Sequence, residues 1–175
     1  MFSYCGGLTS VAIGDNVMVI GDGAFFDCDN LTDLTIGSSV ESIGQSAFYE
    51  CGKLTTVTIP DSVKEIDTMA FYSCGIKEVT IPDNVTTLGN DIFLGCGLTK
   101  ITTPFIGTSK DSPRTFAHIF DSTAYNTLTE VEIKGGIIGN NAFSDNSGTS
   151  YVEKYSELKN VTIGKNVTSI GNSAF

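Results

Sequence analysis

Five cysteines are the side chains of this sequence best suited to metal ligation or disulfide chemistry. They stand 23, 23, 23 and 22 residues apart. A constant spacing in the twenties is typical of a solenoid, whose stacked repeats place equivalent residues about 4.8 Å apart. Parallel Cα–Cβ vectors suit a disulfide poorly, and no Cys-x-x-Cys pair is present. We predict a ladder of buried, reduced thiols, with a zinc site or a bridge as the alternatives, at Cys5, Cys28, Cys51, Cys74 and Cys96.

Catalytic groups are scarce. Nucleophilic catalysis needs a base beside its nucleophile, and the sequence holds one histidine, His118, with Asp111 and Ser112 close in sequence only. Glu130 and Glu132 lie on one face of a predicted strand, about 7 Å apart, as a glycosidase pair would. Because this spacing occurs on countless exposed strands, it does not indicate a catalytic pair. We therefore predict no catalytic residue, and we also predict no metal site and no cofactor.

Polar residues that alternate with apolar ones are the first set of candidate binding residues. Alternation points successive side chains of a strand to opposite faces, so these residues line the outer face of the predicted sheet. The alternative is that threonine is present for its strand propensity alone. The set is Asp33, Thr35, Thr56, Thr58, Glu78, Thr80, Lys100, Thr102, Glu130 and Glu132.

Two irregular segments supply the second set of candidates. Phe105 and Arg114 lie in the first, and Tyr151 and Tyr155 lie in the second. Aromatic residues together with an arginine can anchor a protein partner. The same aromatic side chains can instead pack the loops against the stack.

The elements that position these residues recur every 23 residues or so. In the clearest copy, residues 54–74, Leu54, Val57 and Ile59 alternate with threonines and predict a half-buried strand that ends at Pro60. A polar turn and a second short extended segment follow. The Ala-Phe-x-x-Cys piece then predicts a single helical turn that packs inward. No unit buries its apolar face alone, so stacking must supply the core.

The repeats predict one solenoid domain over residues 1–175, with no linker. Repeats are regular over 1–103, carry insertions over 104–157, and become regular again over 158–175. In the fifth repeat the recurring phenylalanine is Phe120. Phe2 and Phe175 fall inside repeats without polar caps, so we expect that the chain is a fragment and can associate end to end.

Composition restricts the partners. The chain carries 20 acidic and 10 basic residues, a net charge of −10, which repels phosphate backbones and disfavours nucleic acid. No apolar run approaches the ~20 residues of a membrane span. The chain also contains no signal-peptide pattern.

The unit Leu-x-x-Val-Thr-Ile-Pro-x-x-Val-x-x-Ile-Gly-x-x-Ala-Phe-x-x-Cys resembles the leucine-rich repeat of BspA-like surface proteins, the Treponema pallidum-type repeat. The resemblance is clearest over residues 2–103 and 158–175. It implies an α/β solenoid: a right-handed superhelix of about seven repeats with a concave parallel sheet, short second strands and single helical turns. It also implies display on the cell surface or secretion, and adhesion to host or neighbouring-cell proteins or glycans. It supplies no catalytic motif.

Three hypotheses for the function follow. The first is a non-enzymatic protein- or glycan-binding adhesion module that uses the sheet and the two loops. The second is a polysaccharide-active enzyme on a parallel β-helix, an architecture with a similar period. The third is a passive spacer within a larger surface protein.

Overall fold

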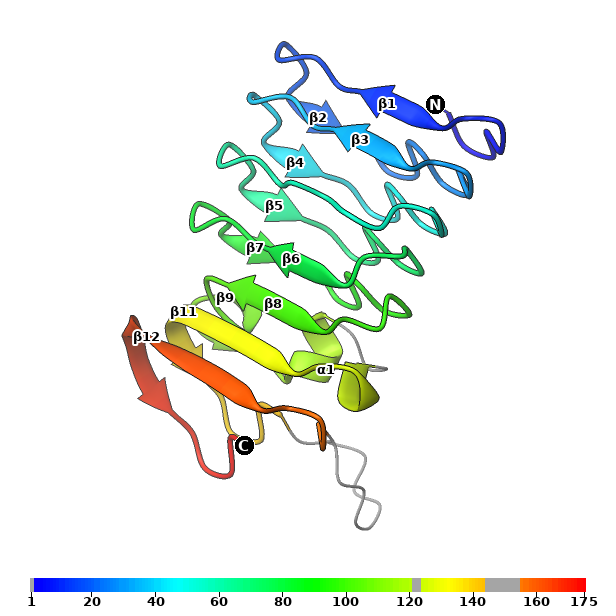
Figure 1. The fold of residues 1–175 in the computed structure, drawn as a ribbon. Helices are drawn as coiled ribbons and strands as arrows, with labels where there is room; N and C mark the ends of the chain where they lie inside the picture. The colour runs from blue at the N-terminus through cyan, green and yellow to red at the C-terminus, as the bar shows by residue number, and fades with distance from the viewer. Residues whose placement is uncertain (1, 121–123, 144–154) are drawn as a thin grey trace.

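The computed structural model describes residues 2–120, 124–143 and 155–175 as a stack of coils, and every coil except the third adds one strand to a front face (Figure 1). Coils are numbered in chain order, with residues 54–66 in the third. Strands of the front face pair in parallel and in register, Ser10 with Asp33 and Glu78 with Lys100, for example. They are β1 (Ser10–Ala12), β3 (Asp33–Thr35), β6 (Glu78–Thr80), β8 (Lys100–Thr103), β11 (Glu130–Ile138) and β12 (Asn160–Ile170).

A second parallel sheet holds the first four coils together behind the front face. Its order β2-β4-β5-β7 follows the chain, and one isoleucine or leucine of each strand is buried. These are the short second strands that the sequence predicts: β2 (Val19–Ile20), β4 (Ser42–Ile43), β5 (Glu65–Ile66) and β7 (Thr87–Leu88).

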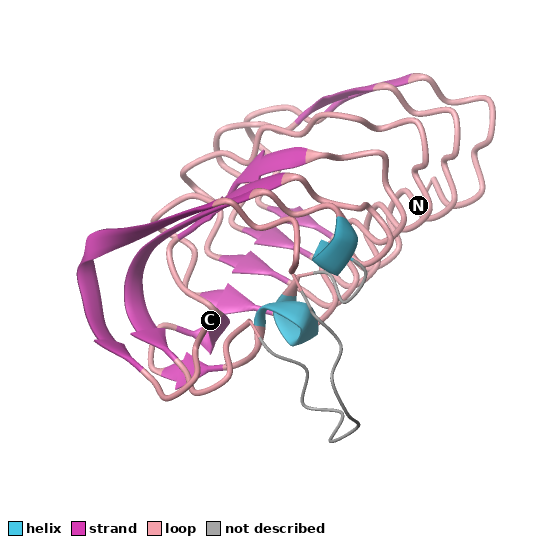
Figure 2. Ribbon diagram, turned by 60° about the horizontal axis from the view of Figure 1, so that its bottom comes forward, coloured by secondary structure: helices cyan, strands magenta, loops and turns pink. Residues whose placement is uncertain are grey.

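In the last two coils, front and second strands merge. β11 and β12 run around the corner of the stack as single bent strands (Figure 2). Their pairing shifts register near Gly135 and again after Gly136, where bulges turn the chain. Gly136 has a φ of 75°, which an ordinary side chain would disfavour.

Aromatic and cysteine ladders run through the interior. The rings of Phe25, Phe48 and Phe71 stack face to face with centroids 5.2–5.3 Å apart. Each buried thiol donates to the carbonyl of a phenylalanine in the preceding coil, as Cys74 Sγ does to Phe48 O at 3.1 Å. The predicted thiol alignment is therefore confirmed. We call its buried members the cysteine ladder: Cys28, Cys51, Cys74 and Cys96.

The predicted helical turns are wrong for the regular repeats. At Ser46, Phe48 and Glu50 the amides donate to carbonyls of the third coil, at 2.8–3.0 Å, while the amides between them close turns within their own coil. Ser46 and Glu50 take left-handed conformations, with φ of 53° and 57°. A helix satisfies its amides internally, whereas this alternating backbone ties each coil to the next.

The fifth coil contains the first insertion. The chain leaves the coil at Pro104, forms the antiparallel pair β9 (Gly107–Ser109) and β10 (Ser112–Pro113), and returns through α1 (Phe116–Ile119). A 3-10 turn, η1 (Ala124–Asn126), follows.

The recurring phenylalanine of this coil is divided between two residues. The carbonyl of Phe120 accepts from the Phe93 amide, as the sequence predicts for this coil. The ring that stacks on the next coil is instead that of Phe116, with its centroid 5.4 Å from that of Phe143. The backbone contact to the preceding coil thus comes from Phe120 and the ring contact to the next coil from Phe116, and the two rings lie 5.0 Å apart within the helical segment.

One predicted strand is missing. Residues 55–59, the strand of the clearest repeat, form no backbone hydrogen bond with the second or fourth coil. The front face therefore consists of two sheets, β1-β3 and β12-β11-β8-β6, on either side of the third coil.

Both ends of the stack expose apolar side chains. Phe2 and Val17 are 57% and 39% exposed at one end, and Ile170 and Phe175 are 53% and 58% exposed at the other. In an interior coil the equivalent positions are buried. End-to-end association therefore stays a prediction with a physical basis.

Candidate functional site

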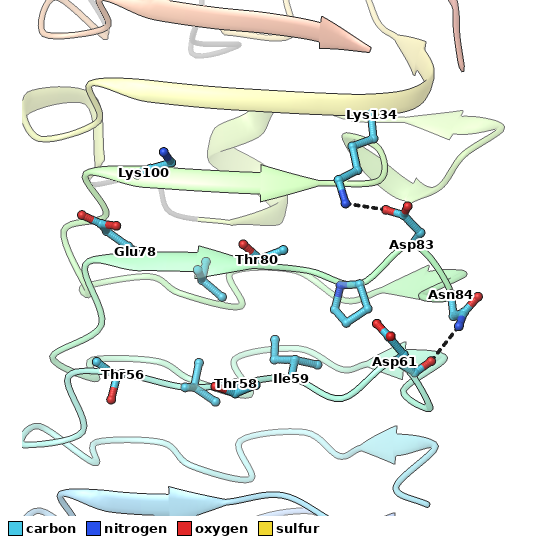
Figure 3. A pocket seen from close by; sticks show the side chains of 13 residues that line it. Thr56, Thr58, Ile59, Asp61, Glu78, Thr80, Asp83, Asn84, Lys100 and Lys134 are labelled. Atoms are coloured by element: carbon cyan, nitrogen blue, oxygen red, sulfur yellow. Dashed lines mark hydrogen bonds and ion pairs between the residues drawn. The ribbon is translucent and has the colours of Figure 1, made fainter. Parts of the chain in front are cut away.

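A groove of about 680 Å³ lies on the front face over the third and fourth coils (Figure 3). Its floor contains the apolar side chains of Val57, Ile59 and Val79, and polar residues surround them. Half of the predicted front-face residues line it: Thr56, Thr58, Glu78, Thr80 and Lys100. We call this the front groove.

Two lysines in the front groove are paired with acids. Lys100 Nζ lies 2.8 Å from Glu130 Oε1, and this hydrogen bond and the nearby charge raise the pKa of Lys100. Lys134 Nζ lies 2.8 Å from Asp83 Oδ1. Among the described residues Asp61 and Glu78, which also line the groove, form no ion pair, so its net character is acidic.

The Lys134–Asp83 pair crosses a coil. Lys134 belongs to the corner of β11 and Asp83 to the turn after β6, 51 residues apart in sequence. The fifth coil leaves this corner free because its chain departs at Pro104 into the β9–β10 hairpin. A second cavity, of about 700 Å³, lies there between the hairpin and Gly135-Gly136 and shares both ion-pair residues with the front groove.

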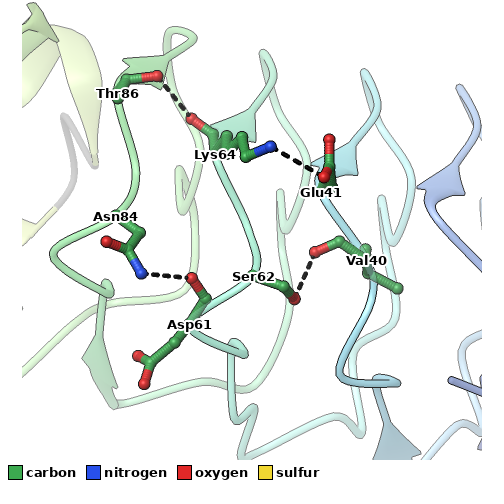
Figure 4. A network of polar contacts seen from close by, with 7 residues as sticks. All are labelled: Val40, Glu41, Asp61, Ser62, Lys64, Asn84 and Thr86. Atoms are coloured by element: carbon green, nitrogen blue, oxygen red, sulfur yellow. Dashed lines mark hydrogen bonds and ion pairs between the residues drawn. The ribbon is translucent and has the colours of Figure 1, made fainter.

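Polar contacts fix the turns at the rim of the groove (Figure 4). Asn84 Nδ2 donates to the Asp61 carbonyl at 2.8 Å, and Ser62 Oγ donates to the Val40 carbonyl at 2.7 Å. Lys64 pairs with Glu41 of the preceding coil at 2.8 Å. The Asn84–Asp61 contact joins two residues that line the groove, and the other two contacts tie the third coil to the second beside it.

The remaining front-face candidates lie outside the groove. Asp33 and Thr35 are exposed on β3, which belongs to the second coil. Thr102 is only 6% exposed, and its hydroxyl donates to Glu132 Oε2 at 3.2 Å. Glu130 is engaged by Lys100. The structure thus brings half of the predicted set together and uses Thr102, Glu130 and Glu132 in contacts between strands.

The aromatic loop candidates pack inward. Phe105 is 3% exposed, and Tyr155 is 7% exposed, with its ring edge-on to those of Phe116 and Phe143. Of the two alternatives for these residues, the structure shows packing against the stack. Arg114 is exposed, and Tyr151 lies outside the described residues.

Sequence reasoning missed two features. Asp83 and Lys134 belong to turns and corners, and only the diverted fifth coil brings them together. An outer aromatic stripe, Phe26, Tyr49 and Tyr72, stacks with centroids 4.3–4.6 Å apart beside the interior phenylalanines. Its 23-residue spacing was a signal in the sequence that could have revealed it.

Reactive constellations are not apparent in the described parts of the chain. His118 is exposed on α1, and within those parts no hydrogen bond joins its ring to Asp111 or Ser112. The same residues contain no group of three or more histidine, cysteine or acidic side chains placed to hold a metal ion. None of their helices is long and apolar enough to span a bilayer.

Solved structures of bacterial leucine-rich repeat proteins share this fold. The Treponema pallidum leucine-rich repeat protein aligns with a TM-score of 0.66 at 23% identity, over 97% of this chain and 76% of that one. A leucine-rich repeat protein from Bacteroides ovatus aligns with a TM-score of 0.52 at 22% identity, over 99% of this chain. This chain spans 65% of the Bacteroides protein.

Sequence comparison identifies the repeat family. A comparison with curated proteins finds no match. The profile of the BspA type leucine-rich repeat region matches this chain with six copies, over residues 1–118 and 70–175. The repeat spacing predicts about seven repeats. The two matched ranges together span the whole sequence, so the chain belongs to the BspA-type leucine-rich repeat family.

Proposed function

We propose that this chain is a non-enzymatic binding module of a bacterial cell-surface or secreted protein, and that it holds a protein or glycan ligand on its front face. The observation that carries the proposal is the front groove, where five exposed or half-exposed polar residues from three coils surround an apolar floor. A few placed polar groups around apolar surface are what a binding site needs. Family membership supports surface display or secretion.

Binding is favoured over catalysis by how the acids are used. Glu130 is paired with Lys100, and Glu132 accepts from Thr102, so neither carboxylate is placed as the free acid or base of a glycosidase. The parallel β-helix alternative requires three long strands per turn. The first four coils have short strands at only two positions.

Arrays of glycans and of host extracellular proteins, probed with the purified chain, test the proposal. Thr80→Arg would fill the front groove, and Thr35→Arg is its matched control, because Thr35 occupies the same repeat position on β3 outside the groove. We expect Thr80→Arg to abolish the array signal and Thr35→Arg to keep it. A wild-type chain that binds nothing on either array would favour the passive spacer instead.

A further inference from the structure

The corner at which the front strand turns toward the second strand recedes in two consecutive coils. In the seventh coil the chain takes seven steps from Ile163 to Ile170, whereas in the sixth it takes five, from Ile133 to Ile138, and these residues pair in register. The fifth coil leaves the stack at Pro104, before this corner. The fourth coil takes seven steps, as the seventh does. A recess therefore lies between the longer turns of the fourth and seventh coils.

The cavity of about 700 Å³ beside the β9–β10 hairpin occupies this recess, and we call it the corner cavity. Its apolar lining includes Val85 of the fourth coil, Pro104 of the fifth and Gly135 of the sixth. Ile137 N donates to Lys110 O at 3.3 Å, so the tip of the hairpin is tied to the corner of the sixth coil. Sites for small ligands are largely preformed and have volumes of roughly 300–1,000 Å³, and the corner cavity meets both conditions.

Three polar side chains of the corner cavity have no partner within the described residues. Lys110 and Asp111 lie at the tip of the hairpin and Asn166 lies in the seventh coil, and none forms an ion pair or a side-chain hydrogen bond there. An ammonium group donates, a carboxylate accepts, and an amide does both. The two carboxylates of the cavity, on Asp83 and Asp111, balance its two ammonium groups, on Lys110 and Lys134. An uncharged ligand whose groups both donate and accept hydrogen bonds therefore suits the cavity.

The corner cavity adjoins the front groove, because Asp83 and Lys134 line both. Figure 3 shows this ion pair at the end of the groove away from Glu78 and Lys100. The side chains of Lys134 and Asp83 remain 34% and 69% exposed, so both can still hydrogen-bond a ligand that passes over them. Groove and cavity thus offer one ligand a path that turns the corner of the stack.

We propose that the front groove and the corner cavity together hold one uncharged oligosaccharide, several sugar residues long, which passes over the Lys134–Asp83 pair. This inference rests on the proposed function and specifies its ligand. A sugar hydroxyl both donates and accepts, so a row of sugar residues can satisfy the carboxylates, ammonium groups, amides and hydroxyls along the path.

The side chains along the path favour a neutral glycan over a protein or an acidic glycan. Protein interfaces are anchored by aromatic and arginine side chains on both partners. Within the described residues no arginine lines the groove or the cavity, and the ring of Phe105 is buried. Carboxylate or sulfate groups on a glycan would be repelled by Asp61 and Glu78, which form no ion pair among the described residues, and by the net charge of −10.

A glycan array tests the inference, followed by calorimetry on the strongest neutral glycan and on its shorter fragments. Asn166→Trp would fill the corner cavity, and Asn16→Trp is its matched control, because Asn16 occupies the same repeat position in the first coil. Asp111→Ala, at the exposed tip of the hairpin, removes one acceptor and serves as a second variant should Asn166→Trp not fold. Thermal unfolding checks the fold of all three variants.

We expect Asn166→Trp to lower the affinity of the full-length glycan about tenfold, to that of its shorter fragments, and to leave the fragments unaffected. Asp111→Ala should also weaken only the full-length glycan, and Asn16→Trp should change neither. The affinity should not depend on salt, because the ligand carries no charge.

The outcomes separate this inference from the proposed function. Binding of proteins only, or of acidic glycans only, would overturn the inference and leave the proposed function standing. A neutral glycan that Thr80→Arg blocks, but that Asn166→Trp and Asp111→Ala leave unaffected at every length, would overturn the inference alone. Glycan binding that survives Thr80→Arg would contradict both.

Discussion

Alanine in place of Gly89 is expected to destabilise the stack, although the same change at Gly21 is harmless. Both glycines follow a strand of the second sheet, at the same repeat position. A Cβ atom on Gly89 would lie 2.2 Å from Thr68 N and 2.6 Å from Asp67 C, both backbone atoms of the preceding coil. A Cβ on Gly21 meets nothing within 4 Å, because this structure has no residue one repeat before Gly21 to lie against it.

The magnitude follows from what must move. Backbone atoms cannot rotate away as a side chain does, so the third and fourth coils must separate locally and strain the Gly89 N to Ile66 O bond of 2.8 Å. Overpacking of this kind costs about 1–3 kcal/mol. At Gly21 the change only restricts the unfolded chain, which is neutral or stabilises by about 0.4–1 kcal/mol. The third coil carries Asp67 at the repeat position of Gly21 and Gly89, so the position itself accepts a side chain. The cost of adding a side chain there therefore depends on how closely the two coils concerned approach each other.

Urea unfolding of the wild type and of both variants, followed by circular dichroism, measures the difference. The midpoint for Gly89→Ala should fall at unchanged slope, and the midpoint for Gly21→Ala should stay or rise. Equal midpoints for the two variants would refute the argument that close contact between coils requires the glycine.

Four further predictions follow from the same structure. Phe71→Ala removes a buried ring that is stacked between two others, and it should lower the free energy of unfolding by about 3–5 kcal/mol. Phe2→Ala, at the exposed end, should lower it by less than about 1 kcal/mol. Urea titration measures both. Hydrogen bonds from the amide and hydroxyl of Ser38 lower the pKa of Asp15 below its ordinary value of 3.8. The Asp15 carboxylate therefore stabilises the fold above pH 3.8, and this contribution is lost as the pH falls through the lowered pKa. In an NMR titration of Ser38→Ala, the pKa of Asp15 should move back toward 3.8. A thiol reagent should modify half-buried Cys5 quickly and the cysteine ladder only on unfolding, because the ladder thiols are buried away from solvent. Burial also raises the pKa of the Cys28 thiol, which disfavours its reactive thiolate. Light scattering should show self-association that grows with concentration, and a monomer at every concentration would contradict association through the apolar ends.

The period of the sequence is sufficient to predict which residues lie inside. Residues at one repeat position must superpose when coils stack, so the phenylalanine and cysteine ladders and the second sheet could be read from spacing alone. Local propensity was a poorer guide. Ala-Phe-x-x-Cys suits a helical turn, but its amides alternate between coils, because hydrogen bonding to a neighbour competes with bonding inside one turn.

The front groove could be predicted only in part. The direction of a side chain depends only on the alternation within its own extended segment. Alternation therefore identified the outward-facing residues Thr56, Thr58, Glu78, Thr80 and Lys100. The break at residues 55–59 depends on how far neighbouring coils separate at the front, and the repeat with the clearest sequence is the one that lost its strand. The contact of Lys134 with Asp83 depends on where the fifth coil sends its chain. The sequence by itself therefore determined what stacks and what is buried, because burial follows the repeat period. The tertiary structure decided where the stack opens, because that is set by contacts between coils far apart in the chain.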